Sequence, residues 1–383
     1  MRLKTLITVL LLSLFSLPVL AQDGPPPPPD LMGGEIVVEG LSGPQGLFID
    51  AEGNLWIIDS GMGGDETVNA VDPTTFATVE GKLGNTSQII KRSPDGTQEV
   101  VALLPSVAVG TDFLGGARLT ALDGTVYATV GAWQAGGGDE VSIPFQAQVV
   151  SITDSEPVTV ADLWAHELAN NPDGTDNKES HPYSIVTGED GLLYVTDAAA
   201  NDLLRVDPAT GEVETLAVFE GLPGIFPNQF RNNEAITDPV PTAVVLGDEG
   251  SIYVSLLSGA PFIPGSAKVV SVAADGTVTD FATGLTMLTD LKLGPDGNLY
   301  ATSFGIFTAD GPVPNSGSIL RIAPDGTAEV VISGLPFLTA IAIDAEGNGY
   351  VTINGIAIPG AGAVVYYEGL TGLAGTPLPA ITQ

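Results

Sequence analysis

The stretch GPDGNLYATS at residues 294–303 contains the pattern that decides the fold. An acidic residue and a glycine, Asp296-Gly297, stand directly before a short apolar run that carries an aromatic residue. Such a step between two apolar runs is typical of a tight β-hairpin, because glycine readily adopts the positive φ that the turn needs. The stretch therefore predicts two antiparallel strands joined by a short turn.

The same pattern occurs six times along the chain. The acidic-glycine steps are Glu52-Gly53, Asp123-Gly124, Asp190-Gly191, Glu249-Gly250, Asp296-Gly297 and Glu346-Gly347. An apolar run precedes each step, and most units continue into a second hairpin, with turns such as APDGT at 323–327. Each unit thus predicts four antiparallel strands, and repeated units of about 40–50 residues are typical of β-propellers. We expect an all-β, six-bladed propeller, with a short helical stretch only near 162–171.

The two ends of the repeat region predict how the ring closes. EIVVEGL at 35–41 resembles EVVISGL at 329–335, which is the fourth strand of the fifth unit. The last unit stops after a third strand, AVVYYEG at 363–369. We therefore expect 35–41 to complete the sixth blade, so that no sheet edge stays free. The propeller would span 35–368, followed by a C-terminal tail at 369–383.

The N-terminal segment has the features of an export signal. Arg2 and Lys4 precede an apolar run at 6–17, and small residues lead up to Ala21. This pattern predicts a signal peptide over 1–21, because the run is shorter than the roughly 20 residues that span a bilayer. Residues 22–34 include five consecutive prolines and predict an extended linker. We expect an exported protein, periplasmic or extracellular, with no membrane span after cleavage.

Composition limits the partners and the chemistry. Of 383 residues, 12 are Lys or Arg and 46 are Asp or Glu, a formal net charge of -34. This balance excludes nucleic acid as the main partner, which needs a basic face. The chain has no cysteine and two histidines, so disulfides, thiolate chemistry and a metal site built from several histidines are excluded. We expect a monomer that binds a small molecule or a protein at its channel mouth.

Functional groups of propellers usually lie around the mouth of the central channel, where innermost strands begin and second strands end. The residues at these positions that could bind a ligand are Asp59, Arg118, Tyr183, Asp197 and Asp290. Asp59, Asp197 and Asp290 could converge on Ca²⁺, which takes 6–8 oxygen ligands. In the alternative interpretation, Asp59 and Asp197 cap strand ends by accepting hydrogen bonds from loop amides.

Four further features each have two interpretations. Asp290 and Lys292 share a strand face and favour a structural ion pair over a catalytic one. Arg118 could likewise pair internally or bind an anion. His181, directly before an innermost strand, is a candidate catalytic base or a structural loop residue. The loop at 170–179 offers Asp173, Asp176 and Glu179 as a second set of Ca²⁺ ligands, or is simply a solvated loop.

Two longer stretches support a family resemblance. Residues 161–219 contain NPDG, then S-x-P-Y, YV-x-DA and NDLLRV, and residues 240–301 contain PFIPGSAKV and T-x-L-T-D-L-K. In these motifs the chain resembles the ScyD/ScyE family of exported bacterial propellers, within the TolB-like group that includes NHL-repeat and gluconolactonase-like propellers. The resemblance implies a six-bladed fold and export. The gluconolactonase-like branch holds one metal with Glu, Asn and Asp, and the matching segment here, SGPQG at 42–46, lacks the Glu.

The sequence leaves three functions open. The first is a binding or interaction propeller for a small molecule or protein in extracytoplasmic metabolism. The second is a Ca²⁺-assisted lactonase or hydrolase, with Asp59, Asp197 and Asp290 around the ion and His181 as base. The third is a structural protein of an exported matrix.

Overall fold

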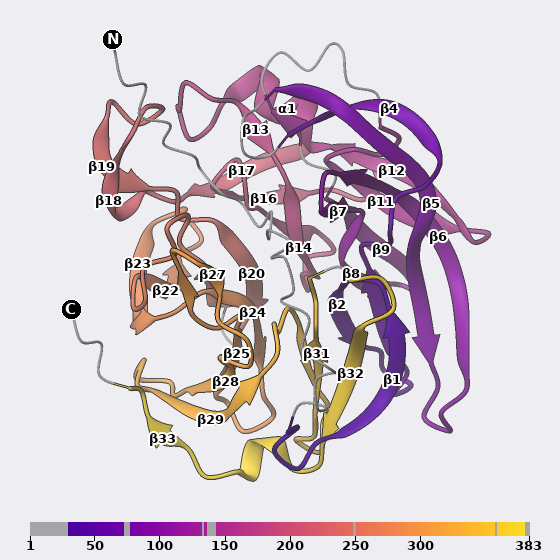
Figure 1. Cartoon of the computed structure of the whole chain (residues 1–383), viewed down its shortest axis with the longest axis vertical. Coiled ribbons are helices and arrows are strands. Elements are labelled where there is room, and N and C mark those ends of the chain that lie inside the picture. The colour runs from indigo at the N-terminus through magenta and orange to yellow at the C-terminus, as the bar shows by residue number, and fades with distance from the viewer. Residues whose placement is uncertain are drawn as a thin grey trace.

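The computed structural model describes residues 30–72, 77–131, 134–135, 143–247, 250–356 and 358–379 (Figure 1). The predicted signal peptide and most of the predicted linker lie outside these residues. Within them the chain is almost entirely β-structure, as expected, with one α-helix, α1 (Leu163–Asn170). Asp162 caps α1 by accepting a hydrogen bond from the Ala165 amide at 2.9 Å. No helix of the described residues is long and apolar enough to cross a membrane.

Six antiparallel sheets of four or more strands dominate the described chain. The first consists of β2 (Pro44–Ile49), β3 (Leu55–Asp59), β5 (Thr78–Arg92), β6 (Gln98–Val109) and β7 (Asp112–Leu114), with β4 (Glu66–Val71) paired to β5. The second consists of β8 (Gly116–Leu122), β9 (Thr125–Val130), β11 (Gln148–Thr153) and β12 (Glu156–Asp162). The third consists of β14 (Pro182–Thr187), β15 (Leu193–Asp197), β16 (Asp202–Val206) and β17 (Val213–Val218).

The second half of the chain forms the other three large sheets. The fourth consists of β20 (Pro241–Leu246), β21 (Ile252–Leu256), β22 (Ala267–Val272) and β23 (Val278–Leu285). The fifth consists of β24 (Leu288–Leu293), β25 (Leu299–Ser303), β28 (Gly317–Ile322), β29 (Ala328–Leu335) and β33 (Thr376–Pro377). The sixth consists of β30 (Ile341–Ile343), β31 (Gly349–Ile353), β32 (Gly362–Tyr367) and β1 (Glu35–Leu41).

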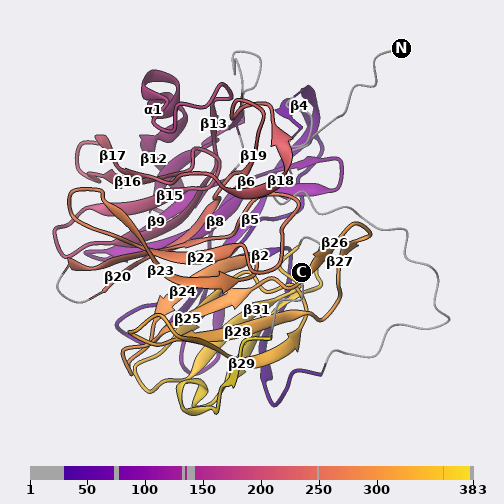
Figure 2. The ribbon, with the colours of Figure 1, turned by 90° about the vertical axis from the view of Figure 1, so that its left-hand side faces the viewer.

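Three two-stranded ribbons complete the described strands: β10 (Gln134–Ala135) with β13 (Glu179–Ser180), β18 (Leu222–Asn228) with β19 (Glu234–Thr237), and β26 (Phe307–Thr308) with β27 (Gly311–Pro312). In Figure 2, β18–β19 and β26–β27 lie toward the same face of the molecule. Two sheets exceed the expected four strands. The first gains β4 and β7 from an insertion, and the fifth gains β33 from the segment expected as a tail.

Five of the acidic-glycine turns lie within the described residues and form as predicted, whereas Glu249 of the remaining turn lies outside them. Gly297 has φ of 77°, the left-handed conformation that favours glycine. The Tyr300 hydroxyl donates to the Asp296 carboxylate at 2.8 Å, and the Tyr194 hydroxyl donates to Asp190 at 2.9 Å. The acid that opens the turn is thus held by the aromatic residue of the following strand.

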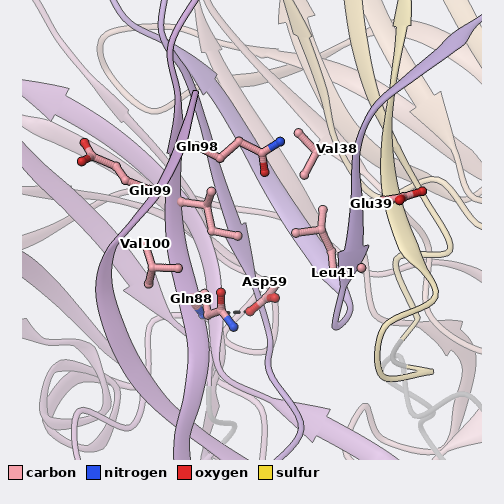
Figure 3. Close-up of a pocket in the computed structure, with 10 residues that line it drawn as sticks. Val38, Glu39, Leu41, Asp59, Gln88, Gln98, Glu99 and Val100 are labelled. Atoms are coloured by element: carbon pink, nitrogen blue, oxygen red, sulfur yellow. Dashed lines mark hydrogen bonds between the residues drawn. The ribbon is translucent and has the colours of Figure 1, made fainter. Parts of the chain in front are cut away.

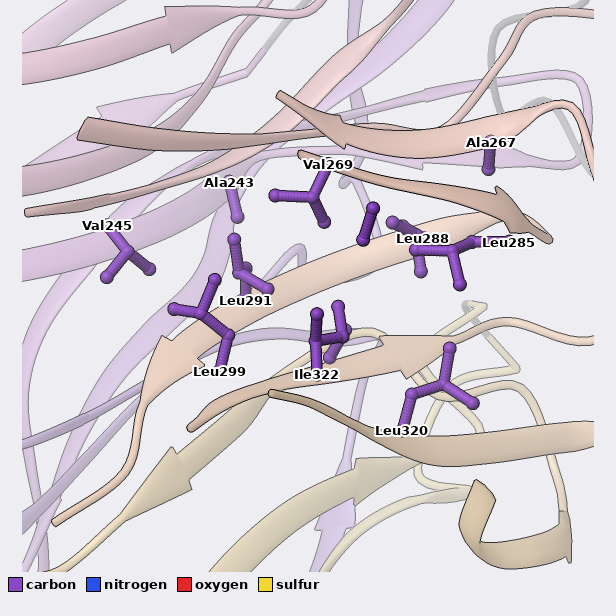
Figure 4. Packing of buried hydrophobic residues seen from close by; sticks show 12 residues of the cluster. Ala243, Val245, Ala267, Val269, Leu285, Leu288, Leu291, Leu299, Leu320 and Ile322 are labelled. Carbon is purple, nitrogen blue, oxygen red and sulfur yellow. The ribbon is translucent and has the colours of Figure 1, made fainter. Parts of the chain in front are cut away.

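Apolar side chains fill the space between neighbouring sheets. Between the fourth and fifth sheets, Ala243 and Val269 pack with Leu291, Leu299 and other buried residues (Figure 4). Strands β20 and β25 are buried along nearly their whole length, on both faces, so their residues do not alternate between apolar and exposed polar positions. Packing between sheets therefore accounts for the high apolar content of so acidic a chain.

The innermost strands contact one another in cyclic order. β2 contacts β8, and the series continues through β14, β20, β24 and β30, which contacts β2 again. The predicted pairing of 35–41 with the last unit is also present: β1 runs antiparallel to β32, with Glu35 opposite Tyr366 and Leu41 opposite Gly362. The first and last described strands of the repeat region thus belong to one sheet.

Candidate functional site

Arg118 lies where the innermost strands meet. It is the third residue of β8, and only 2% of it is exposed. One terminal nitrogen, Nη1, donates to the main-chain oxygen of Gln45, and the other, Nη2, donates to those of Thr289 and Thr339 at 2.8 Å each. This one side chain therefore joins the innermost segments of four sheets.

An aromatic ring and a carboxylate complete the surroundings of Arg118. Its guanidinium carbon lies 4.5 Å from the centre of the Tyr183 ring, and its Nε lies 3.9 Å from Asp290 Oδ1. Lys292 Nζ is 3.0 Å from the same oxygen, and the Ile341 amide donates to Asp290 Oδ2 at 3.0 Å. The structural ion pair considered for Asp290 and Lys292 is thus present. Arg118 is engaged internally, because both of its terminal nitrogens donate to main-chain oxygens.

The three aspartates expected to converge on Ca²⁺ are not brought together. Asp59 accepts hydrogen bonds from the amides of Ser42 and Gln88, and Asp197 accepts from Ser180 Oγ and from several loop amides, including that of His181. These are the strand-end caps of the alternative interpretation. Among the described residues, no three His, Asp or Glu side chains are grouped so that they could hold one ion.

The channel residues also do not fit the metal that the resemblance to gluconolactonase-like propellers implies. Gln45 stands in the first unit, where that branch has a Glu. The carboxylate of Asp290 already faces two cations, Arg118 and Lys292. A divalent ion beside the fixed guanidinium would meet like charge at short range.

Asp59 instead lines a cleft at the junction of the sixth and first sheets. The cleft has a volume of about 230 Å³ and lies between β1 and the strands β5 and β6 (Figure 3). Glu39 and Glu99 are also in its lining, which makes the cleft acidic. Burial raises the pKa of Asp59 to about 6, although the amides of Gln88 and Ser42 act in the opposite direction.

A buried apolar cluster that includes the Tyr183 ring lies next to Arg118. Its members, which we call the mouth cluster, are Ala117, Tyr183, Ala198, Val240, Leu257, Phe262, Met287 and Phe304. Phe337 and Ile356 are half-buried at its border, and the rings of Phe304 and Phe337 are 5.2 Å apart. Each member of the cluster is at most 5% exposed, so the cluster is packed core.

The backbone around the mouth cluster is strained at equivalent positions of three sheets. Val240, Met287 and Phe337 each come just before an innermost segment and have φ of 54°, 42° and 47°. For a residue with a bulky side chain this left-handed conformation costs roughly 1–3 kcal/mol. Strain of this kind often accompanies functional sites, and here it fixes three apolar side chains around the channel.

His181 is the titratable residue at the mouth. It precedes β14, and its ring centre is 5.8 Å from that of Tyr183. Gly131 allows this placement, because a Cβ there would lie 2.8 Å from His181 Nε2. Burial lowers the pKa of His181 to about 4, so the imidazole is neutral at pH 7. The Tyr183 hydroxyl donates to Gln45 Oε1 at 3.1 Å, which adds a polar pair beside the ring.

The loop set expected as a second group of Ca²⁺ ligands is divided. Asp176 is exposed, whereas Glu179 and the Asp173 side chain are buried. Sequence reasoning missed the buried acids near them, Glu167 on α1 and Asp202 at the start of β16. A usable signal was present for Asp202, because this charged residue directly precedes the buried apolar pair Leu203 and Leu204.

Comparison with known proteins supports the fold class. The family model described as the SMP-30/Gluconolactonase/LRE-like region matches residues 184–366. A putative oxidoreductase (glucose dehydrogenase) from Thermus thermophilus superposes with a TM-score of 0.52 at 17% identity, covering 87% of this chain and 98% of that one. No curated protein matches the sequence.

Two other solved structures are similar in the same way. A structural genomics protein of unknown function from Bacteroides thetaiotaomicron has a TM-score of 0.51 at 12% identity, over 88% of this chain and 73% of that one. A gluconolactonase from Xanthomonas campestris has a TM-score of 0.46 at 12% identity, over 88% and 98%. Identities this low are informative about the fold alone. The chain is therefore an all-β protein of propeller type in which residues 184–366 match the SMP-30/gluconolactonase/LRE-like model.

Proposed function

We propose that the six large sheets are the blades of one closed propeller over residues 35–368, exported by way of the signal peptide at 1–21. The cyclic contacts of the innermost strands and the pairing of β1 with β32 support closure. Deleting residues 30–41 tests it, because β1 completes the sixth sheet and its Val38 and Leu41 are buried among residues of the first and sixth sheets. We expect a chain that no longer unfolds cooperatively; a deletion that keeps the parent melting temperature would refute closure.

We propose further that this propeller is lactonase-like and binds a small cyclic ester at the channel mouth. The single observation that carries this proposal is His181, a neutral imidazole whose ring centre is 5.8 Å from that of Tyr183 in the mouth cluster. The match of 184–366 to the SMP-30/gluconolactonase/LRE-like region supports the same class. The apolar walls favour an ester with an aromatic or aliphatic body over a bare sugar acid.

In the proposed reaction His181 accepts a proton from water while the water oxygen bonds to the ester carbonyl carbon. The ring C–O bond then breaks, and the departing alkoxide takes the proton back from the imidazolium. The product is an open hydroxy acid. Because a base with a pKa of about 4 is weak at neutral pH, we expect slow turnover.

A second candidate is a propeller that binds such a compound, or a protein, without transforming it. The specific observation in its favour is Arg118, which is fixed by main-chain oxygens and offers no free donor pair to a developing negative charge. In this case the mouth would recognise the ligand by shape and apolar contact alone.

One experiment separates the two candidates. The mature chain is tested for acid release from an aromatic lactone, dihydrocoumarin, and from aliphatic γ- and δ-lactones, and for a thermal shift with each. We expect hydrolysis that falls about 100-fold in His181→Gln. His166→Gln is the matched control, because His166 lies on α1 and bonds Thr215, away from the mouth.

The remaining outcomes are also decisive. Thermal shifts without acid release would favour the binding protein, and activity retained in His181→Gln would reject His181 as base. If no lactone is hydrolysed and none shifts the melting temperature, the lactonase-like proposal is wrong.

A further inference from the structure

A set of buried oxygen atoms with no hydrogen-bond donor lies around α1 and the start of β16. Both carboxylate oxygens of Glu167 and of Asp202 have no partner, and neither does one oxygen of Glu179 or the side-chain oxygen of Asn201. Glu167, Asn201 and Asp202 are at most 2% exposed, and Glu179 is 7% exposed. These four residues, called the acidic cluster here, thus hold six buried acceptor oxygens that the protein does not satisfy.

Two cationic groups lie nearby, but no hydrogen bond joins either of them to a carboxylate of the cluster. Arg231 donates through Nε to Asp238 at 2.7 Å, and its Nη2, which has no hydrogen-bond partner among the described residues, is 3.8 Å from Asp173. Lys178 donates to the main-chain oxygen of Leu168 at 2.5 Å and is not buried. The neighbouring carboxylate of Asp197 differs from the cluster, because loop amides and Ser180 already satisfy it.

Two carboxylates of the cluster, those of Glu167 and Asp202, lie close enough to interact electrostatically. Burial raises the pKa of Glu167 to about 8, and the charges of Asp197 and Asp173 add to this shift, while the charge of Lys178 and the nearby Glu179 amide oppose it. The pKa of Asp202 is raised by burial and by Asp197 and Glu167, and that of Glu179 by burial and Asp238. Buried like charges of this kind are costly unless a cation balances them.

The orientation of Asn201 indicates whether a proton or a metal ion balances the buried negative charge of the cluster. Its amide nitrogen donates to Asp173 Oδ2 at 2.9 Å and to the Ala199 oxygen at 3.0 Å, which fixes its free oxygen. A carboxylate can take a proton and become a donor, whereas an amide oxygen cannot. A set of six oxygens without nitrogen or sulfur matches the preference of Ca²⁺, which takes 6–8 oxygen ligands.

We propose that Glu167, Glu179, Asn201 and Asp202 bind Ca²⁺. Because no three acidic side chains of the described residues are already grouped around one point, binding includes rotation of the Glu167 and Asp202 side chains toward the ion. The ion would join α1, the loop that ends in β13, and the third sheet. This site is separate from the channel mouth and does not depend on lactone chemistry.

The test measures Ca²⁺ binding to the mature chain by titration calorimetry, and melting temperature in chelator and in millimolar CaCl₂. We expect one bound Ca²⁺ and a melting temperature that rises with its concentration. Glu167→Gln and Asp202→Asn should each weaken binding at least tenfold and abolish the rise. In chelator these variants should melt no lower than the parent, because the replacing amide has the same shape as the carboxyl group and carries no charge to bury.

Asp176→Asn is the matched control, since it removes one exposed negative charge from the same loop and should keep both Ca²⁺ binding and the rise in melting temperature. The proposal is overturned if the parent binds no Ca²⁺ at millimolar concentration. It is also overturned if Glu167→Gln and Asp202→Asn, folded in chelator by circular dichroism, bind Ca²⁺ like the parent. If Ca²⁺ does not change the melting temperature of the parent, but the parent becomes more stable as the pH falls from 8 to 5, then protons rather than Ca²⁺ balance the charge of the cluster.

Discussion

The channel axis and the acidic cluster both bury charge, but they balance it in opposite ways. On the axis, the single cation of Arg118 faces main-chain oxygens, the Tyr183 ring and the carboxylate of Asp290. In the acidic cluster, carboxylates such as Glu167 and Asp202 face each other without a donor. Of the described side-chain atoms in the first region, only Arg118 Nε lacks a hydrogen-bond partner, and it lies 3.9 Å from the Asp290 carboxylate, whereas the second region leaves several carboxylate oxygens without a donor.

This difference separates a structural role from a binding role. Buried polar groups of folded proteins are normally satisfied, so a satisfied network is consistent with a purely architectural function. A buried polar network with unsatisfied groups instead indicates that a ligand, an ion or a proton binds there. The chain thus uses an internal guanidinium where the resemblance to gluconolactonase-like propellers implies a metal, and concentrates uncompensated negative charge at the third sheet.

Replacing Arg118 should give the largest effect. Arg118→Met leaves the oxygens of Thr289 and Thr339 without donors and the Asp290 carboxylate without one of its two cations. We expect the free energy of unfolding to fall by about 3–5 kcal/mol, measured by urea denaturation. Arg205→Met is the control, because its pair with Glu214 is solvent-exposed and should contribute about 0–1 kcal/mol. Equal losses in both variants would show that the axis is not a satisfied core network.

Replacing Asp290 should have a smaller effect. Asn keeps one oxygen to accept the Ile341 amide, but it removes the negative charge between Arg118 and Lys292. We expect a loss of about 1–3 kcal/mol in unfolding free energy, since Arg118 retains its main-chain acceptors. Asp280→Asn removes a half-exposed partner of Lys268 and should change stability little. A loss as large as that of Arg118→Met would mean that Asp290, rather than the main-chain oxygens, holds the guanidinium.

The repeat and the pairing of the chain ends could be predicted because they depend on local residues. Gly297 indicates a turn because glycine favours the positive φ that this turn requires. The strand at 35–41 resembles the fourth strand of another unit. Even the short helix at 163–170 is signalled by its capping residue, Asp162. Each of these features depends on short segments of fewer than ten residues, which for the repeat and the chain ends are compared with one another.

The role of Arg118 could not be predicted in the same way. Its acceptors, the main-chain oxygens of Thr289 and Thr339, lie 171 and 221 residues away in sequence, and every residue type has such an oxygen. The acidic cluster was hidden for a related reason. Glu167 belongs to a helical pattern and Asp202 to a strand pattern, so only the packing of α1 beside β13 and the third sheet reveals them together.

The smallest effect concerns His181, which borders the satisfied axis through Tyr183. Its folded pKa of about 4 lies below the ordinary value of 6.5, so folding favours the neutral ring. The contribution of His181 to stability is therefore complete above pH 6.5 and is lost as the pH falls toward 4. In His181→Gln that portion of the acid sensitivity should disappear, which paired urea titrations of both proteins at about pH 7, 5.5 and 4.5 would measure. Parallel losses in the two proteins would mean that the ring is hydrated enough to be protonated in place, and the apolar mouth would then be a poorer site for a neutral base.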